Sequence, residues 1–206
     1  MLKWRRNRKV RSFFILLNLP AVQKNDMLKA VFLLYLRKKC EIMGKAKDKT
    51  NVMRILDQKK IKYNTYNYLD TGAISGIEVA EAMGENPDRV FKTLVTIGSS
   101  KTNYVFLVPV NQELDLKKAA KCVQEKKIEM IKSKELLPLT GYIHGGCSPI
   151  GMKKFFQTVI HKTAEDFDTI FFSGGKIGYQ VETSLLELQK VIRYTLADII
   201  CKREEE

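Results

Sequence analysis

Residues 92–110, with the sequence KTLVTIGSSKTNYVFLVPV, carry the strongest secondary-structure pattern in the chain. The runs 92–97 and 104–110 are rich in β-branched and aromatic residues, which favour strands. Between them lies a polar segment, residues 98–103, that begins with glycine and is typical of a turn. The pattern therefore predicts an antiparallel β-hairpin with a central strand.

Shorter periodic segments flank this hairpin on both sides. Ser75 and Glu78 form a capping-box pattern, which predicts a helix that runs to Met83 and ends at Gly84. Helices are also expected over residues 51–60, 115–123, 133–137 (stopped by Pro138), 184–192 and 196–201. Strands are expected over residues 63–69, 128–131, 158–161, 169–172 and 179–182. This order predicts a mixed α/β fold of the α+β kind, with a largely antiparallel mixed sheet packed by helices, and not a doubly wound parallel sheet.

The positive charge of this 206-residue chain is unevenly distributed. The formal net charge is +13, and residues 1–42 contribute +9 of it, from eleven Lys or Arg against two acidic residues. The other 164 residues carry 25 basic and 21 acidic side chains, a net of +4. This mild excess suits a protein that meets a phosphate backbone, but a solvated lysine-rich surface explains it equally well.

Residues 1–42 also differ from the rest in composition. Their apolar runs, residues 13–19 and 30–36, are far shorter than the roughly 20 residues that span a bilayer, and no small-x-small cleavage site follows directly. Three interpretations stay open: a basic arm that touches a membrane surface or RNA, an accessory helix, or translated sequence upstream of a start at Met43. We favour the last, and expect residues 1–42 to be a basic extension outside a folded domain of residues 43–206.

The four cysteines, Cys40, Cys122, Cys147 and Cys201, lie far apart, with no Cys-x-x-Cys pair and no Cys/His cluster. This spacing fits neither structural zinc nor a disulfide framework, and it favours reduced thiols in the cytoplasm. We expect no metal, no cofactor and no membrane association.

Three segments have compositions that packing alone does not explain. Residues 145–151, GGCSPIG, contain paired glycines that can turn backbone N–H groups towards a ligand oxygen, although a purely structural loop is the simpler alternative. Lys153 and Lys154 follow and could meet phosphate. Residues 173–178, SGGKIG, place small residues at the end of a strand. In residues 90–95, VFKTLV, a lysine stands between apolar neighbours, so it either extends to the surface or binds an anion in a pocket.

Sharper catalytic motifs are incomplete. Residues 146–150 lack the last glycine of a nucleophile elbow, and residues 175–177 lack the Ser/Thr and the upstream glycine of a P-loop. His144 and Cys147 can be drawn as a base and a nucleophile, but two loop residues three apart rarely align in this way. Without a triad or a metal set, a hydrolase with this sequence has to act by positioning its substrate.

Together these segments resemble the YbaK/EbsC family, the trans-editing relatives of the insertion domain of bacterial prolyl-tRNA synthetases. The similarity rests on residues 91–94 (FKTL), 141–151 (GYIHGGCSPIG) and 170–176 (IFFSGGK), and it covers about residues 47–200 in the order and spacing of the family. The resemblance implies a mixed sheet curled into a partly open barrel with surrounding helices. It also implies a pocket for the 3′-terminal adenosine of tRNA and its esterified amino acid.

The resemblance further implies roles for individual residues. Lys92 matches the family's invariant lysine and is expected to hold the terminal phosphate or ribose region, while the backbone of Gly145 faces the ester. With Gly146, whose amide is expected to join that of Gly145 in stabilising an oxyanion, these are the expected catalytic residues. The expected substrate-binding residues are Tyr68, Thr93, Ser148, Ser173, Gly178 and Gln180. Relatives often have aspartate or serine at the position of Gln180, so a polar contact can persist there but a carboxylate role cannot.

The activity implied by the resemblance is the hydrolysis of mischarged cysteinyl-tRNA(Pro), and also of cysteinyl-tRNA(Cys), with the substrate's own thiol as the attacking group. The form Gly-Gly-x-Ser-Pro-Ile-Gly points to cysteine, and alanine on proline tRNA is the nearest alternative. A non-catalytic module that binds tRNA or a synthetase is the alternative from another class. The expected partners are aminoacylated proline tRNA and, if the protein acts while docked, prolyl-tRNA synthetase.

Overall fold

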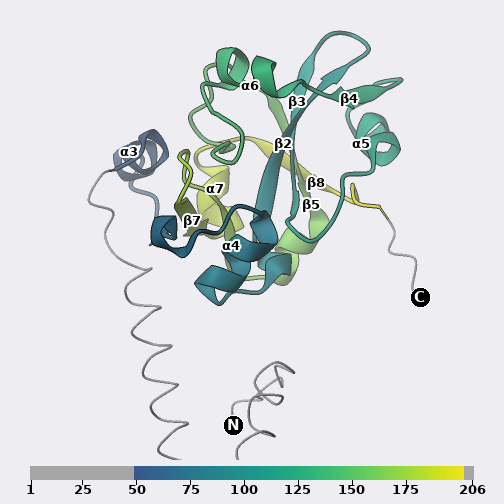
Figure 1. Cartoon of the computed structure of the whole chain (residues 1–206). Coiled ribbons are helices and arrows are strands. Elements are labelled where there is room, and N and C mark those ends of the chain that lie inside the picture. The colour runs from purple at the N-terminus through teal and green to yellow at the C-terminus, as the bar shows by residue number, and fades with distance from the viewer. Residues whose placement is uncertain (1–48, 202–206) are drawn as a thin grey trace, which may run out of the picture. The chain divides into compact units, whose positions relative to one another are not determined.

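The computed structural model describes residues 49–201 (Figure 1). The helices are α3 (Asn51–Gln58), α4 (Gly76–Met83), α5 (Leu116–Cys122), α6 (Ser133–Thr140) and α7 (Leu185–Gln189). The strands are β1 (Asn64–Asn67), β2 (Phe91–Gly98), β3 (Asn103–Pro109), β4 (Ile128–Met130), β5 (Gln157–His161), β6 (Ile170–Ser173), β7 (Tyr179–Thr183) and β8 (Tyr194–Ala197). No helix in this part of the chain is long and apolar enough to cross a bilayer. The extension predicted for residues 1–42 lies outside the described residues.

The larger of the two sheets has the strand order β4-β2-β3-β5-β8 and is built on the predicted hairpin. Strands β2 and β3 pair antiparallel, from Phe91 opposite Pro109 to Ile97 opposite Asn103. Strand β4 adds antiparallel on one side of the hairpin, whereas β5 and β8 add in parallel on the other (Figure 1).

The smaller sheet, β1-β7-β6, is antiparallel throughout. A parallel bridge between Val90 and Phe171 joins it to the larger sheet, and within residues 49–201 the two sheets do not close into a complete barrel. The prediction of a largely antiparallel mixed sheet surrounded by helices is confirmed.

The capping residues predicted for two helices, α4 and α5, are confirmed. Ser75 and Glu78 form the reciprocal capping box at the start of α4, and Gly84 ends that helix in a left-handed conformation with φ of 68°. At α5, the carboxylate of Asp115 accepts hydrogen bonds from the amides of the first turn. These caps satisfy amides that have no partner inside their own helix.

Two predictions about helices were wrong. Residues 196–201 do not form a helix, because β8 pairs in parallel with the open edge of β5 and so satisfies backbone groups of both strands. A short apolar run cannot distinguish these outcomes by its periodicity. Helix α6 continues past Pro138 to Thr140, whose hydroxyl donates a hydrogen bond of 2.7 Å to the Leu136 carbonyl, and ends at Gly141 with φ of 86°.

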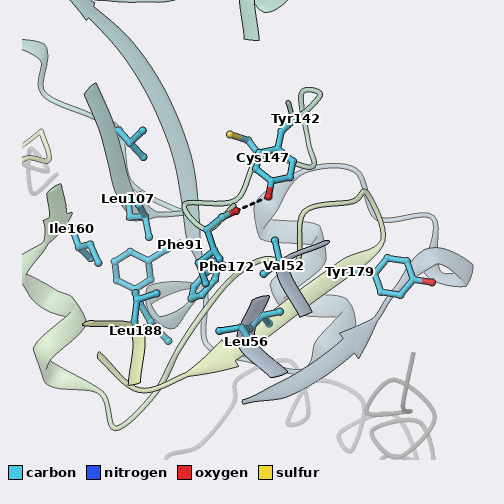
Figure 2. Close-up of a cluster of buried hydrophobic side chains, with 14 of the residues drawn as sticks. Val52, Leu56, Phe91, Leu107, Tyr142, Cys147, Ile160, Phe172, Tyr179 and Leu188 are labelled. Carbon is cyan, nitrogen blue, oxygen red and sulfur yellow. Dashed lines mark hydrogen bonds between the residues drawn. The ribbon is translucent and has the colours of Figure 1, made fainter. Parts of the chain in front are cut away.

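The main hydrophobic core fixes both glycine-containing loops (Figure 2). Side chains of α3, including Val52, pack there against residues of the larger sheet and of α7. The hydroxyl of Tyr142, itself part of this core, donates a hydrogen bond of 2.5 Å to the carbonyl of Ile150. At the N-cap of α3, the Thr50 hydroxyl donates a hydrogen bond of 2.6 Å to the Gly174 carbonyl. The second loop is therefore bonded directly to the start of α3, and the first loop packs in the same hydrophobic cluster as α3.

Candidate active site

A cavity of about 430 Å³ opens along the free edge of β2. Its walls come from parts of the chain that are far apart in sequence: Tyr68, residues 74–76 and Val79 at the start of α4, residues 91–95 of β2, Val110, residues 130–136 around the start of α6, His144, Gly145, Cys147, Ser173 and Gln180. Strand β4 pairs only with Thr96–Gly98, so among the described residues no strand pairs with the first half of β2 on this side, and the bridge at Val90 lies just before β2. The short length of β4 leaves room for the cavity.

Thr93 presents polar groups to this cavity. The Val95 carbonyl accepts a hydrogen bond of 3.3 Å from the Ile131 amide, on the β4 side of β2. Since peptide groups two residues apart in a strand face the same side, the peptide group of Thr93 faces the cavity beyond the end of β4. The Oγ1 atom of Thr93 is buried and has no hydrogen-bond partner among residues 49–201.

Gln180 supplies a second buried polar atom without a partner. The residue is 8% exposed, and no described residue donates a hydrogen bond to its Oε1 atom. Burial raises the pKa of the neighbouring Tyr68 hydroxyl, against the opposing effect of hydrogen bonds to the Gly178 backbone and the Gln180 side chain. A buried polar atom left unpaired costs about 1–3 kcal/mol. Two such atoms in the wall of one cavity, on Gln180 and Thr93, therefore indicate a polar ligand.

Lys92 lines the same cavity, but its ammonium group is already paired. Its Nζ atom lies 2.8 Å from Oε1 of Glu113, and the two side chains are 27% and 80% exposed. Successive side chains of a strand point to opposite faces of the sheet, so the side chains of Thr93, Phe91 and Val95 share one face of β2 and the side chain of Lys92 lies on the other. Because an ion pair this exposed contributes at most about 1 kcal/mol, Lys92 can exchange Glu113 for another anion.

The two glycines predicted to form an oxyanion site have different surroundings. Gly145 lines the cavity, whereas the Gly146 amide donates a hydrogen bond of 3.1 Å to the Ile143 carbonyl. A Cβ atom on Gly146 would lie 3.2 Å from the backbone nitrogen of Ile177, so this glycine allows the two loops to pack closely. The amides of Gly145 and Cys147, which both line the cavity, make no hydrogen bond with any described residue. Of these three amides, those of Gly145 and Cys147 are therefore left for a ligand, whereas that of Gly146 is used within the loop.

Of the remaining predicted residues, Ser173 lines the cavity and two others do not. Ser148 is fully buried, and its Oγ atom accepts a weak hydrogen bond of 3.5 Å from the Ile150 amide. Gly178 has φ of 89°, and its carbonyl accepts a hydrogen bond of 2.8 Å from the Tyr68 amide. A Cβ atom there would clash with Leu69. Gly178 therefore supports the position of Tyr68 without lining the cavity itself.

The cavity contains no activated nucleophile. Burial raises the pKa of the Cys147 thiol to about 12, so this group is protonated at neutral pH. His144 is exposed at the cavity, and no hydrogen bond between His144 and Cys147 is present in the described structure. Residues 49–201 also contain no group of three or more His, Cys, Asp or Glu side chains that could hold a metal ion. The arrangement can bind and polarise a ligand through neutral groups and a lysine.

Several cavity residues carry no signal in the sequence. Ile74, 91% exposed, and Met130, 47% exposed, resemble ordinary apolar residues near element ends. Ser75 and Gly76 are recognisable only as the start of a helix. The place of Ile74, Ser75 and Gly76 at the cavity depends on how α4 packs against Val90, Val110 and Phe171, and that of Met130 on where β4 ends. Only the tertiary structure gives that information.

The chain is similar in sequence to a family of known proteins. The model of the family described as the aminoacyl-tRNA editing domain matches residues 73–191. An Enterococcus faecalis protein named "Putative Cys-tRNA(Pro)/Cys-tRNA(Cys) deacylase EbsC" is 43% identical over 159 residues, which cover 77% of this chain and 97% of that protein.

Two solved structures share the fold at low sequence identity. "Crystal structure of a putative trans-editing enzyme for prolyl tRNA synthetase" matches with a TM-score of 0.65 and 22% identity, over 74% of this chain and 99% of that chain. "Crystal structure of hypothetical protein APE2540" matches with a TM-score of 0.66 and 17% identity, over 74% of this chain and 100% of that chain.

Proposed function

The chain belongs to the family of aminoacyl-tRNA editing domains, and on that basis we propose that it is a deacylase that hydrolyses cysteinyl-tRNA(Pro) and also cysteinyl-tRNA(Cys). The resemblance noted in the sequence is confirmed. The relative named for this activity is matched over almost its whole length. The proposed role is translational quality control in the cytoplasm, where the wrong amino acid is removed before the tRNA is used.

The observation that carries the proposal is the set of unpartnered polar groups around the cavity. They are Thr93 Oγ1, Gln180 Oε1 and the amides of Gly145 and Cys147. Hydrolysis of an aminoacyl ester needs donors for the developing oxyanion and acceptors for the substrate's ammonium group. It does not need an enzymic nucleophile, because the ester is already activated.

Each of these groups has a proposed role. The amides of Gly145 and Cys147 bind the oxyanion, where one well-placed donor is worth roughly 3–4 kcal/mol. Gln180 Oε1 and Thr93 Oγ1 accept hydrogen bonds from the α-ammonium group of the amino acid. Lys92 leaves Glu113 and binds the terminal phosphate. Each contact satisfies a group that lacks a partner or is held only by an exposed ion pair.

The proposed attacking atom is the sulfur of the substrate cysteine. Its bond to the carbonyl carbon forms as the bond from that carbon to the ribose oxygen breaks, and the ribose oxygen takes the thiol proton. Water then hydrolyses the resulting β-thiolactone to free cysteine. This route fits a cavity in which the only cysteine of the wall, Cys147, is protonated. A serine ester, whose hydroxyl is a much weaker nucleophile, is expected to react far more slowly.

The test is incubation with cysteinyl-, seryl-, alanyl- and prolyl-tRNA(Pro), with measurement of amino-acid release. Cysteine is expected to be released fastest. Thr93→Val removes an unpaired buried hydroxyl in the cavity wall, and Thr96→Val, the matched control, removes one in the same strand outside the cavity. Thr93→Val is expected to lower kcat/KM about tenfold, the effect of roughly one hydrogen bond, while Thr96→Val leaves it unchanged.

The same assay separates the alternatives. If the folded protein releases no amino acid, it is a module that binds tRNA or a synthetase without catalysis. Faster release of alanine would assign it to alanyl-tRNA(Pro), and equal rates for the cysteine and serine esters would contradict attack by the substrate thiol. Docking on prolyl-tRNA synthetase is tested separately, by co-sedimentation of the two proteins with and without tRNA(Pro).

A further inference from the structure

A second hollow, of about 700 Å³, is lined by basic residues and lies outside the proposed active site. Its walls come from the segment 149–158, before and into β5, and from residues 189–193, between α7 and β8. We call it the basic hollow. Its charged lining residues are Lys153, Lys154, Lys190 and Arg193, and no acidic residue lines it.

Three of these four cations have no carboxylate partner in the described part of the chain. Lys190 lies 2.5 Å from Glu187, so its charge is largely compensated. Lys153 donates only to the Leu137 carbonyl, at 3.4 Å, and neither Lys154 nor Arg193 forms an ion pair with any residue between 49 and 201. Unpaired cations gathered in a concave surface create a local positive potential that attracts polyanions.

An exposed aromatic ring lies in the same hollow. Phe155 is 78% exposed and follows Lys153 and Lys154 directly in the chain. Proteins that bind RNA combine cations for the phosphates with aromatic rings on which bases stack. A site for a small acidic metabolite does not require an aromatic ring that is this exposed.

One loop connects the basic hollow to the cavity. His144, Gly145 and Cys147 line the cavity, and the residues that follow, from Pro149 onwards, line the basic hollow. A polynucleotide whose 3′ end occupies the cavity extends beyond it, and the basic hollow is a cation-rich surface joined to the cavity by this loop. We propose that the basic hollow binds the sugar-phosphate backbone of the tRNA whose 3′ end enters the cavity. This inference rests on the proposed function and adds a binding surface for the body of the RNA.

The test measures binding of uncharged tRNA(Pro) to the full chain as a function of salt concentration. The hollow variant carries Lys153→Gln, Lys154→Gln and Arg193→Gln. The control variant loses the same charge at exposed lysines that line neither hollow, through Lys117→Gln, Lys121→Gln and Lys126→Gln. Thermal unfolding of both variants checks that the fold is kept, and the basic residues 1–42 are common to all three proteins.

The expected result is a loss of affinity and of salt dependence that is confined to the hollow variant. Each phosphate contact contributes about 0.7–0.9 to the slope of log K against log salt, so three lost contacts lower the slope by roughly 2–3. At 0.1 M salt, one decade below 1 M, each lost contact weakens binding by about five- to eightfold. Equal losses in the two variants, or no loss in the hollow variant, would overturn the proposal.

A second measurement separates this inference from the deacylase proposal. The hollow variant is expected to keep its kcat on saturating cysteinyl-tRNA(Pro) while its KM rises, and to hydrolyse cysteinyl-adenosine, which has no RNA body, as fast as the unaltered protein. Binding of uncharged tRNA needs no catalysis, so it reports on the basic hollow even if no ester is hydrolysed. Unchanged tRNA affinity with lost binding to anionic phospholipid vesicles would assign the hollow to a membrane surface and overturn the proposal.

Discussion

Replacing Cys147 by alanine is expected to leave catalysis intact. Burial raises the pKa of this thiol to about 12, so at pH 7.5 roughly 1 thiol in 30,000 is ionised, compared with about 3 in 100 for a thiol with the ordinary value of 9.0. A nucleophile with about a thousandth of the usual thiolate population is a poor choice for this reaction. Alanine keeps the backbone amide proposed to bind the oxyanion.

Cys147→Ala is expected to lower the stability of the fold instead. The side chain is 7% exposed and packs in the main core, so its truncation should lower the free energy of unfolding by about 1–2 kcal/mol and the Tm by roughly 2–8 °C. Cys201→Ala, at an exposed thiol, is the control and should change neither stability nor activity.

Two assays check the reasoning on Cys147. The first compares kcat/KM for cysteinyl-tRNA(Pro), which should stay within about twofold of the unaltered protein. The second follows alkylation by iodoacetamide in the native state with peptide mass spectrometry. Cys147 should react far more slowly than Cys201, because its thiol is buried and its pKa is raised, whereas the thiol of Cys201 is exposed. A folded Cys147→Ala protein with a hundredfold loss of kcat/KM would refute the argument and make Cys147 the nucleophile.

Two further predictions concern charged groups of the fold. Glu113→Gln removes the carboxylate that pairs with Lys92 at 2.8 Å and so frees the lysine for the substrate. The KM for aminoacyl-tRNA should therefore fall by about two- to fivefold at low salt, with little change in Tm, in steady-state kinetics at two salt concentrations. A higher KM would mean that Glu113 positions Lys92. His161 is buried, its Nδ1 atom accepts a hydrogen bond of 3.2 Å from the Ile199 amide, and burial lowers its pKa below 6.5. Because the unfolded chain then binds the proton more readily, the stability from His161 is present above about pH 6.5 and is lost as pH falls below it, with a limiting slope of about 1.4 kcal/mol per pH unit. Urea unfolding between pH 5 and 7.5 should show the free energy of unfolding decreasing below about pH 6.5 in the unaltered protein, no more steeply than this limit, and decreasing less in His161→Asn; identical slopes would contradict the assignment.

The elements that could be predicted from sequence are those with signals of their own. The β2–β3 hairpin follows from two β-rich runs around a glycine-initiated turn, and α4 follows from the capping box at Ser75. Strand β8 has no such signal, because its pairing partner, β5, lies more than thirty residues earlier in the chain. The break predicted at Pro138 failed for another reason: one missing amide in a helix can be outweighed by caps such as those of Thr140 and Gly141.

Some of the predicted site residues line the cavity, and others only shape the loops around it. Lys92, Gly145, Tyr68, Thr93, Ser173 and Gln180, suggested by family resemblance, all line one cavity. Gly146, Ser148 and Gly178 do not, because motif similarity marks the loops without separating residues that line the cavity from residues that shape the turn. Which glycine amide is free depends on the hydrogen bond from Gly146 to Ile143, and this contact is set by the tertiary structure of the loop.

The difficulty of finding this cavity from sequence has a chemical cause. Motif searches succeed where chemistry needs a rare titratable group, such as a thiolate or a metal-binding histidine. Here the groups proposed to contact the ligand are the peptide group and hydroxyl of Thr93, one carboxamide and two loop amides, and peptide groups occur at every position of a chain. What makes them distinctive is the absence of partners among residues 49–201, which follows from the short strand β4 and from the way the two loops pack with α3. Lengthening β4 so that it paired with Thr93 would close the cavity while keeping every proposed active-site residue in the sequence.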